Sequence, residues 1–305
     1  IYLALSWFPG HMAKAINEIK GLLKLIDVII EITDARAPLA SSNEILAEIT
    51  GGRPKVVVLN KADLADDRVT GEWMSHFEDE GYRAVKCNCM LGNGVNDVVK
   101  AARGMSMSAF KDKGKDRNKK VRALVVGLPN VGKSSFINRV AKKAKTKVGD
   151  RPGVTRSKQW IEVDSGFEIL DTPGIMPPKV DDPSVWFCLS ALGMIDQDLL
   201  DLEALAVSLI TVCEKISPGS IVSKYNLAEG TEGSVQMLEA IARKRGCLRQ
   251  GGVPETDKAS EIVIREFRAG KIGRISLERP DDDILSMLLP VREDGDDACD
   301  DEGEG

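Results

Sequence analysis

The chain has 305 residues, of which 43% are hydrophobic and 29% charged, which fits one large or two ordinary globular domains. No apolar run reaches the roughly 18 residues that a membrane span requires, and residues 1–5 lack the features of a signal peptide, so we expect a cytoplasmic protein. The net charge of −5 is unevenly distributed along the chain. Residues 281–305 carry eleven acids and one Arg, so the preceding 280 residues have a net charge of +5.

The first 180 residues alternate between helical and extended patterns. Apolar residues at three- and four-residue spacing predict a helix over residues 12–25. Short apolar runs predict strands at residues 27–33, 56–59, 83–88 and 123–126, and a hairpin of strands at 159–163 and 167–170. Helical stretches separate most of these strands, so the predicted fold class is α/β with a parallel-rich sheet.

The pattern changes in two places. Residues 104–120 are polar, basic and contain Gly, which predicts a linker. After Pro183 no strand pattern returns, and helical spacing recurs at residues 185–194, 199–212, 235–245 and 259–267. We therefore expect an α/β domain over 1–180, a helical domain over 181–280, and a disordered acidic tail over 281–305.

A phosphate-binding motif follows the predicted strand 123–126. Gly127-Leu-Pro-Asn-Val-Gly132-Lys133-Ser134 fits the P-loop pattern between a strand and a helix. The backbone around Asn130, Val131 and Gly132 would close on phosphate oxygens at the start of that helix. Lys133 would reach the β- and γ-phosphates, the Ser134 hydroxyl would ligate Mg²⁺, and Ser135 would contact the α-phosphate.

The base is predicted by a second motif. Asn60, Lys61, Ala62 and Asp63 directly follow the predicted strand 56–59. The Asp63 carboxylate can accept hydrogen bonds from guanine N1–H and its exocyclic amine, a donor pair that adenine lacks. Asn60 can brace the site, and the Lys61 stem can cover the base. Together with the P-loop, this motif predicts GTP and GDP as ligands and disfavours an ATPase.

Further site residues follow other strands. After residues 83–88, Asn88 and the backbone N–H of Cys89 are placed to contact guanine O6, although most G-proteins have Ser-Ala-Lys at this element. Asp171-Thr-Pro-Gly174 would hold Mg²⁺ through water at Asp171 and sense the γ-phosphate at the Gly174 N–H. Thr155 offers a second hydroxyl for Mg²⁺, in a loop expected to order only with triphosphate.

The order of these motifs is unusual. Ordinary G-proteins place the P-loop first, whereas here Asn60–Asp63 and Asn88 precede it, so the chain is circularly permuted. This order, with Trp7-Phe-Pro-Gly-His-Met-Ala-Lys14, Asp34-Ala-Arg-Ala-Pro38 and Phe267-Arg-Ala-Gly-Lys-Ile-Gly-Arg-Ile275, resembles the RbgA/YlqF family of circularly permuted GTPases over about residues 7–279. The resemblance implies GTP hydrolysis, a role in late assembly of the large ribosomal subunit, and a helical RNA-binding C-terminal domain. The ten basic against five acidic residues of 241–279 agree with it.

Catalysis needs a group other than the usual glutamine. Ile175 follows Gly174 where many G-proteins place the Gln that orients water. His11 is the candidate, as a catalytic residue that orients water or as a residue that packs or caps the first helix; the resemblance favours catalysis. Asn130 either shapes the P-loop or helps to bind K⁺, as in similar GTPases. Arg36 either anchors a turn or contacts RNA.

Three kinds of function compete. The first is a GTPase stimulated by the large ribosomal subunit precursor and its rRNA, acting as a monomer without a membrane partner. The second is a nucleotide-dependent rRNA-binding scaffold with little turnover, which Ile175 favours and His11 opposes. The third, a membrane or signalling G-protein, is disfavoured because no lipidation motif or basic amphipathic anchor is present.

Overall fold

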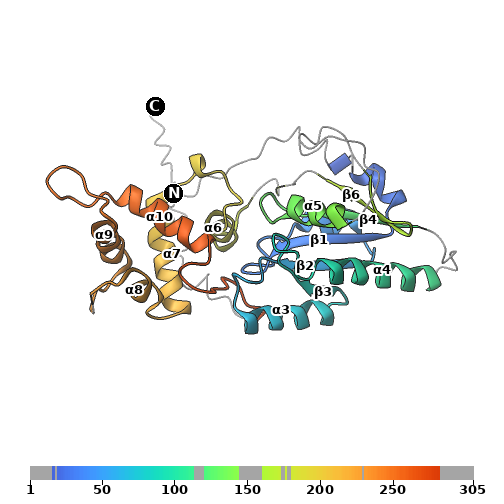
Figure 1. Ribbon diagram of the computed structural model, residues 1–305, viewed down its shortest axis with the longest axis horizontal. Helices are drawn as coiled ribbons and strands as arrows, with labels where there is room; N and C mark the ends of the chain where they lie inside the picture. The colour runs from blue at the N-terminus through green and yellow to red at the C-terminus, as the bar shows by residue number, and fades with distance from the viewer. Residues whose placement is uncertain are drawn as a thin grey trace, which may run out of the picture.

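Six strands form one sheet in the spatial order β3-β2-β1-β4-β6-β5 (Figure 1). The computed structural model describes residues 16–17, 19–112, 120–143, 160–172, 176, 180–228 and 230–281. The strands are β1 (Val28–Asp34), β2 (Lys55–Asn60), β3 (Arg83–Lys86), β4 (Val121–Val126), β5 (Trp160–Asp164) and β6 (Phe167–Asp171). Only β5 runs antiparallel to its neighbour among these strands, so the predicted α/β fold with a parallel-rich sheet is confirmed.

The central strands are apolar because both faces of the sheet are covered. All seven residues of β1 are buried, as are five of the six in β4. β4 leads into the P-loop and pairs with β1 on one side and β6 on the other. The P-loop strand is therefore central in space although three strands precede it in the chain, as the permuted motif order predicts.

Helices cover the two faces. The segments are η1 (Leu23–Leu25), α2 (Glu44–Thr50), α3 (Asp67–Asp79), α4 (Val95–Asp112) and α5 (Lys133–Lys143). Side chains of α4 and α5, such as Val98 and Phe136, pack in one cluster with Ile30 and Val58 of the sheet. On the opposite face, residues preceding β1 pack under Leu124, and α3 packs Trp73 under Leu59.

The predicted linker over residues 104–120 is wrong in its first half. The α4 helix continues to Asp112, so the described part of this range is helical up to that residue. Ala102, Ser106 and Phe110 are buried at four-residue spacing along the inner side of α4. The many Lys, Ser and Gly residues of this segment conceal that stripe in the sequence. Residues 113–119 lie outside the described residues.

The described residues from 183 to 268 contain helices and no strand of the sheet. They are α6 (Pro183–Ala191), η2 (Gln197–Leu199), α7 (Leu202–Ile216), α8 (Ser220–Tyr225), α9 (Ser234–Arg245) and α10 (Thr256–Arg268). In Figure 1 these C-terminal helices, drawn from yellow to orange, lie beside the sheet, and α7 packs against α9 and α10. The short α8 was not predicted. No helix in the described part of the chain has the length and apolar character to cross a membrane.

Candidate nucleotide-binding site

The loop between β4 and α5 has the backbone that a phosphate-binding loop requires. Gly127, Asn130 and Gly132 have φ values of 148°, 61° and 109°. A side chain at Gly127 would collide with the carbonyl oxygen of Ile32, and one at Gly132 with the Asn60 amide. Both glycines are thus required by close approach of neighbouring groups. The loop opens onto the N-terminus of α5, whose free N–H groups favour an anion.

Lys133 lies folded into this loop. Its ammonium donates hydrogen bonds to the carbonyl oxygens of Gly127, at 3.0 Å, and Leu128, at 2.6 Å. Burial lowers the pKa of Lys133 to about 8, and the nearby charge of Asp171 opposes that shift. An ammonium has three N–H donors, so a partly desolvated Lys133 in this position can direct one toward a phosphate oxygen.

Asn60 joins three predicted parts of the site. Its Nδ2 donates to the carbonyl of Val131 in the P-loop at 2.6 Å, and its Oδ1 accepts from the Cys89 N–H at 2.9 Å. The Ala62 N–H donates to the carbonyl of Cys87 at 3.1 Å. The structure therefore brings the predicted base residues and the predicted phosphate residues to one edge of the sheet, where the parallel strands β2, β3 and β4 end.

Lys61 has an ion-pair partner that the sequence did not identify. Its φ of 57° is in the left-handed region, which is uncommon for a residue other than Gly. Its Nζ lies 2.9 Å from Oδ2 of Asp34, the β1 residue in register with Asn60. Arg36 also binds Asp34, through Nε and Nη2 at 2.9 Å each. Burial alone would raise the pKa of Asp34, but the charges of Arg36 and Lys61 hold it well below its usual range.

The magnesium ligands are only partly described. Asp171 ends β6 half-buried; burial raises its pKa and the charge of Lys133 opposes this. Its neighbour Thr172 is fixed by a 2.7 Å hydrogen bond from Oγ1 to the carbonyl of Val125. Ser134 is the second residue of α5. A hydroxyl and a carboxylate near phosphate oxygens are the donors that Mg²⁺ takes while keeping several waters, so these residues fit that ion. Thr155, Gly174 and His11 lie outside the described residues.

Asn130 contacts the C-terminal helices. Its Nδ2 donates to the carbonyl of Gly193, just after α6, at 2.7 Å. Arg268, at the end of α10, donates to the carbonyls of Ser190 and Ala191 in α6. The P-loop therefore touches the first turn after α6 directly, a contact that the sequence did not predict.

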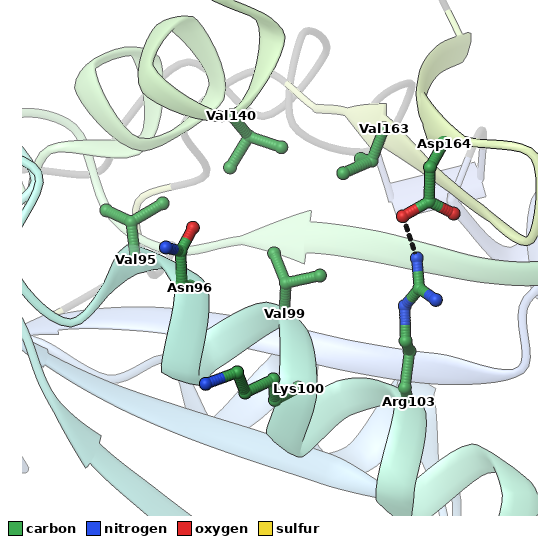
Figure 2. Close-up of a pocket in the computed structure, with 8 residues that line it drawn as sticks. All are labelled: Val95, Asn96, Val99, Lys100, Arg103, Val140, Val163 and Asp164. Carbon is green, nitrogen blue, oxygen red and sulfur yellow. Dashed lines mark hydrogen bonds and ion pairs between the residues drawn. The ribbon is translucent and has the colours of Figure 1, made fainter. Parts of the chain in front are cut away.

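One cavity lies beside this edge of the sheet, and a second lies farther along the sheet. One, of about 210 Å³, is lined by Cys89, Met90, Ser135, Asn138, Arg139 and Lys142, so it adjoins the predicted site. The other, of about 350 Å³, lies between α4, α5 and β5 and is shown in Figure 2 with the Arg103–Asp164 ion pair at its rim. None of the predicted nucleotide residues lines this second cavity.

Known GTPases are similar to this chain. The family described as "50S ribosome-binding GTPase" matches residues 122–226. The chain is 45% identical to Ribosome biogenesis GTPase A of Bacillus cereus, over 92% of this chain and 95% of that protein. It is 32% identical to Mitochondrial ribosome-associated GTPase 1 of Bos taurus, over 90% and 88%. The GNP-bound crystal structure of YlqF from T. maritima matches with a TM-score of 0.59 and 28% identity, over 88% and 99%.

Proposed function

Because this chain belongs to the ribosome biogenesis GTPase A family, we propose that it hydrolyses GTP to GDP and phosphate in the service of late large-subunit assembly. Binding of GTP and a role in ribosome biogenesis follow from the family. The large-subunit precursor as the specific partner is part of our proposal. One observation carries the assignment of the site: the Asn60 side chain hydrogen-bonds the P-loop and the Cys89 backbone at once. Phosphate and guanine recognition are thereby built around one side chain.

The residues divide the chemistry among themselves. The P-loop backbone and Lys133 hold the phosphates, and Asp63 selects guanine. The Cys89 N–H is engaged by Asn60 Oδ1, so the predicted bond from this N–H to guanine O6 is not kept. Ser134, Asp171 and Thr155 would hold Mg²⁺, which neutralises charge that develops on the phosphate oxygens. His11 is proposed to orient the attacking water, since Ile175 cannot form a hydrogen bond with it.

The partner is proposed from charge. Arg243, Lys244 and Arg245 occupy the last turn of α9, and all three are exposed, as are Arg249 and Lys258 nearby. Such a group attracts polyanions, and we propose rRNA as the polyanion because the relatives are named for the ribosome. We propose a nucleotide-binding domain over 1–180, an rRNA-binding helical domain over 181–280, a tail over 281–305, and a monomer that acts in the cytoplasm. The alternative is an rRNA-binding scaffold with little turnover.

Asp63→Asn tests base selection. An amide in place of the carboxylate presents a donor to the base, so GDP affinity should fall by at least about 100-fold while affinity for xanthosine diphosphate rises. Titration of both nucleotides by fluorescence measures the change. Asp79→Asn, on the exposed end of α3, is the matched control and should bind GDP like the wild type. Unchanged GDP affinity in Asp63→Asn would remove Asp63 from the site.

His11→Ala distinguishes a GTPase from an rRNA-binding scaffold with little turnover. The chain has two His residues, and His76, which pairs with Glu80 on α3, supplies the control. GTP turnover in the presence of large subunits should fall by about 100-fold in His11→Ala, as for a lost water-orienting group, while GTP affinity stays within about twofold. His76→Ala should keep full turnover. Full turnover in His11→Ala would contradict the catalytic role, and negligible turnover in the wild type would favour the scaffold.

Potassium is proposed as a further cofactor, through the Asn130 side-chain oxygen. A cation there would offset charge that an arginine finger neutralises in other GTPases, so turnover in KCl should exceed that in NaCl of equal ionic strength by roughly tenfold. Asn130→Gly keeps the left-handed backbone at φ 61° and should abolish the difference. Equal rates of the wild type in both salts would contradict potassium binding.

A further inference from the structure

The segment after α10 returns to the guanine-recognition loop. We call residues 60–63 the base loop and residues 270–278 the strap. Arg274 of the strap donates from Nη2 to the carbonyl of Ala62 at 3.1 Å and from Nε to the carbonyl of Ala65 at 2.8 Å. Its Nη1 also pairs with Oδ2 of Asp67 at 2.7 Å. A single guanidinium therefore binds the backbone of the base loop and the turn that follows it.

The strap is a fixed part of the structure. Ile272, Ile275 and Leu277 are buried, and Ser276 Oγ accepts from the Asp66 N–H at 3.1 Å. Gly270 has a φ of 68°, and a side chain there would approach Leu64 to 2.8 Å, so the strap lies directly against the chain that leaves the base loop. Arg274 is thus held in place from both ends of the strap.

The opposite end of the strap is anchored as firmly. The Leu277 N–H donates to the carbonyl of Arg36 at 2.7 Å. The Glu278 carboxylate accepts from the N–H groups of Leu39 and Ala40 at 2.8 and 2.9 Å. Burial raises the pKa of Glu278 to about 7, and those two N–H donors oppose the shift. The strap therefore connects the turn after β1 with the base loop after β2.

The peptide groups on both sides of Ala62 are held. The Ala62 N–H, in the peptide that joins it to Lys61, donates to the carbonyl of Cys87. The Ala62 carbonyl, in the peptide that joins it to Asp63, accepts from Arg274, so the backbone that carries both charged side chains is fixed. The hydrogen bond to Asp67 raises the pKa of Arg274, so the guanidinium stays charged while it binds these carbonyls.

A second connection reaches Lys61. Asp34 pairs with Lys61 and with Arg36, and Arg36 Nη1 donates to the carbonyls of Phe267 and Arg268 at the end of α10 at 3.5 and 3.3 Å. The two charged residues beside the predicted base are therefore each linked to the segment that begins where α10 ends.

We propose that Arg274 is a positioning residue for guanine recognition, which holds the base loop in its guanine-binding form from outside the nucleotide site. This inference rests on the proposed function of residues 60–63 as the guanine loop. Displacement of the strap would loosen the base without disturbing the phosphates, and so would speed nucleotide release. The C-terminal helices would then control exchange through the strap as well as contact RNA.

Arg274→Ala tests the role by dissociation of two labelled nucleotides. GDP should dissociate about tenfold faster than from the wild type, the effect of about one charge-assisted hydrogen bond. Inosine diphosphate lacks the exocyclic amine and depends less on Asp63, so its dissociation should change by less than about threefold. Single-turnover hydrolysis of bound GTP should be unchanged, because the hydrogen bonds of Arg274 go to Ala62, Ala65 and Asp67 and not to the P-loop.

Two controls separate positioning from general damage. Asp67→Asn removes the exposed ion pair but keeps both carbonyl contacts of Arg274, and should change GDP release by less than about twofold. Arg83→Ala removes an exposed Arg at the start of β3 that pairs with Glu78, and should not change GDP release. Equal acceleration of GDP and inosine diphosphate, or unchanged GDP release, would overturn the proposal. Failure of the wild type to bind GDP would instead overturn the proposed function of the base loop.

Discussion

Replacing Lys133 with alanine is expected to weaken GDP binding by about 100-fold, or about 2.7 kcal/mol, because charge-assisted hydrogen bonds to the phosphates are lost. In the structure the ammonium already lies inside the loop, against the carbonyls of Gly127 and Leu128. It therefore reaches a phosphate with little rearrangement, and the free energy of binding is not spent on ordering a long side chain. Calorimetric titration with Mg²⁺ and GDP measures the loss.

Lys142→Ala provides the comparison for that experiment. Lys142 lies on the same helix, α5, and its side chain is exposed. Its removal changes the charge equally but should leave GDP affinity within about twofold, since an exposed charge is screened by water and salt. Similar losses in both variants would mean that charge in general, rather than Lys133 in the loop, determines binding.

Arg36→Ala is expected to destabilise the fold by about 3 kcal/mol, the lower end of the usual cost of breaking a buried ion pair, because Lys61 remains as a second partner of Asp34. Arg36 is 2% exposed and Asp34 fully buried, and the two form a bidentate pair. The same guanidinium bonds the end of α10 and lies 5.6 Å from the ring centre of Phe267. The variant therefore loses the contact between the sheet and the C-terminal helices together with the ion pair. Urea denaturation without nucleotide measures the free energy of unfolding.

Arg68→Ala is the matched control for Arg36→Ala. Arg68 pairs with Glu72 on the surface of α3 at 3.0 Å, and the Arg side chain is 77% exposed. Its loss should reduce the free energy of unfolding by no more than about 0.5 kcal/mol. Equal stability of Arg36→Ala and wild type would show that the buried pair does not hold the two parts of the protein together.

The sheet and the loops at its edge were predictable because their signals are local. Every strand falls within two residues of its predicted bounds, since a parallel sheet covered on both faces needs continuous apolar runs. The P-loop and the base loop were found because each joins an apolar strand to residue types that its chemistry requires. The second half of the helix over residues 95–112 was predicted as part of a linker, because charged and small residues conceal its buried side.

The strap and the buried ion pair could not be predicted in the same way. Ile272, Ile275 and Leu277 are buried in a segment without regular secondary structure, so no helical or strand period marks them. The residues that hydrogen-bond Arg274 and Glu278 of the strap, Ala65 and Trp73, lie 209 and 205 positions earlier in the chain. Arg36 was considered as a turn anchor or an RNA contact; the structure places it on Asp34 and on the end of α10. Because the Arg36 side chain is buried, it cannot contact RNA, and the role as a turn anchor remains.

These contacts explain why nucleotide and ribosome binding should be coupled. The P-loop touches Gly193 through Asn130, and the base loop touches the strap through Arg274. Both contacts join the nucleotide site to the segment that carries the basic residues of α9 and α10. If GTP and GDP place the loops differently, we expect the helices to respond, and by linkage the proposed rRNA partner would alter nucleotide affinity by the same factor.

Co-sedimentation with large-subunit particles tests this account most directly. The protein would be mixed with purified particles in the presence of GDP or of a non-hydrolysable GTP analogue, and the bound fraction read from sucrose gradients. We expect the analogue-bound protein to sediment with the particles and the GDP-bound protein to remain largely at the top of the gradient. Equal binding of both forms, or binding of neither, would contradict a GTPase that acts on the large subunit through its nucleotide state.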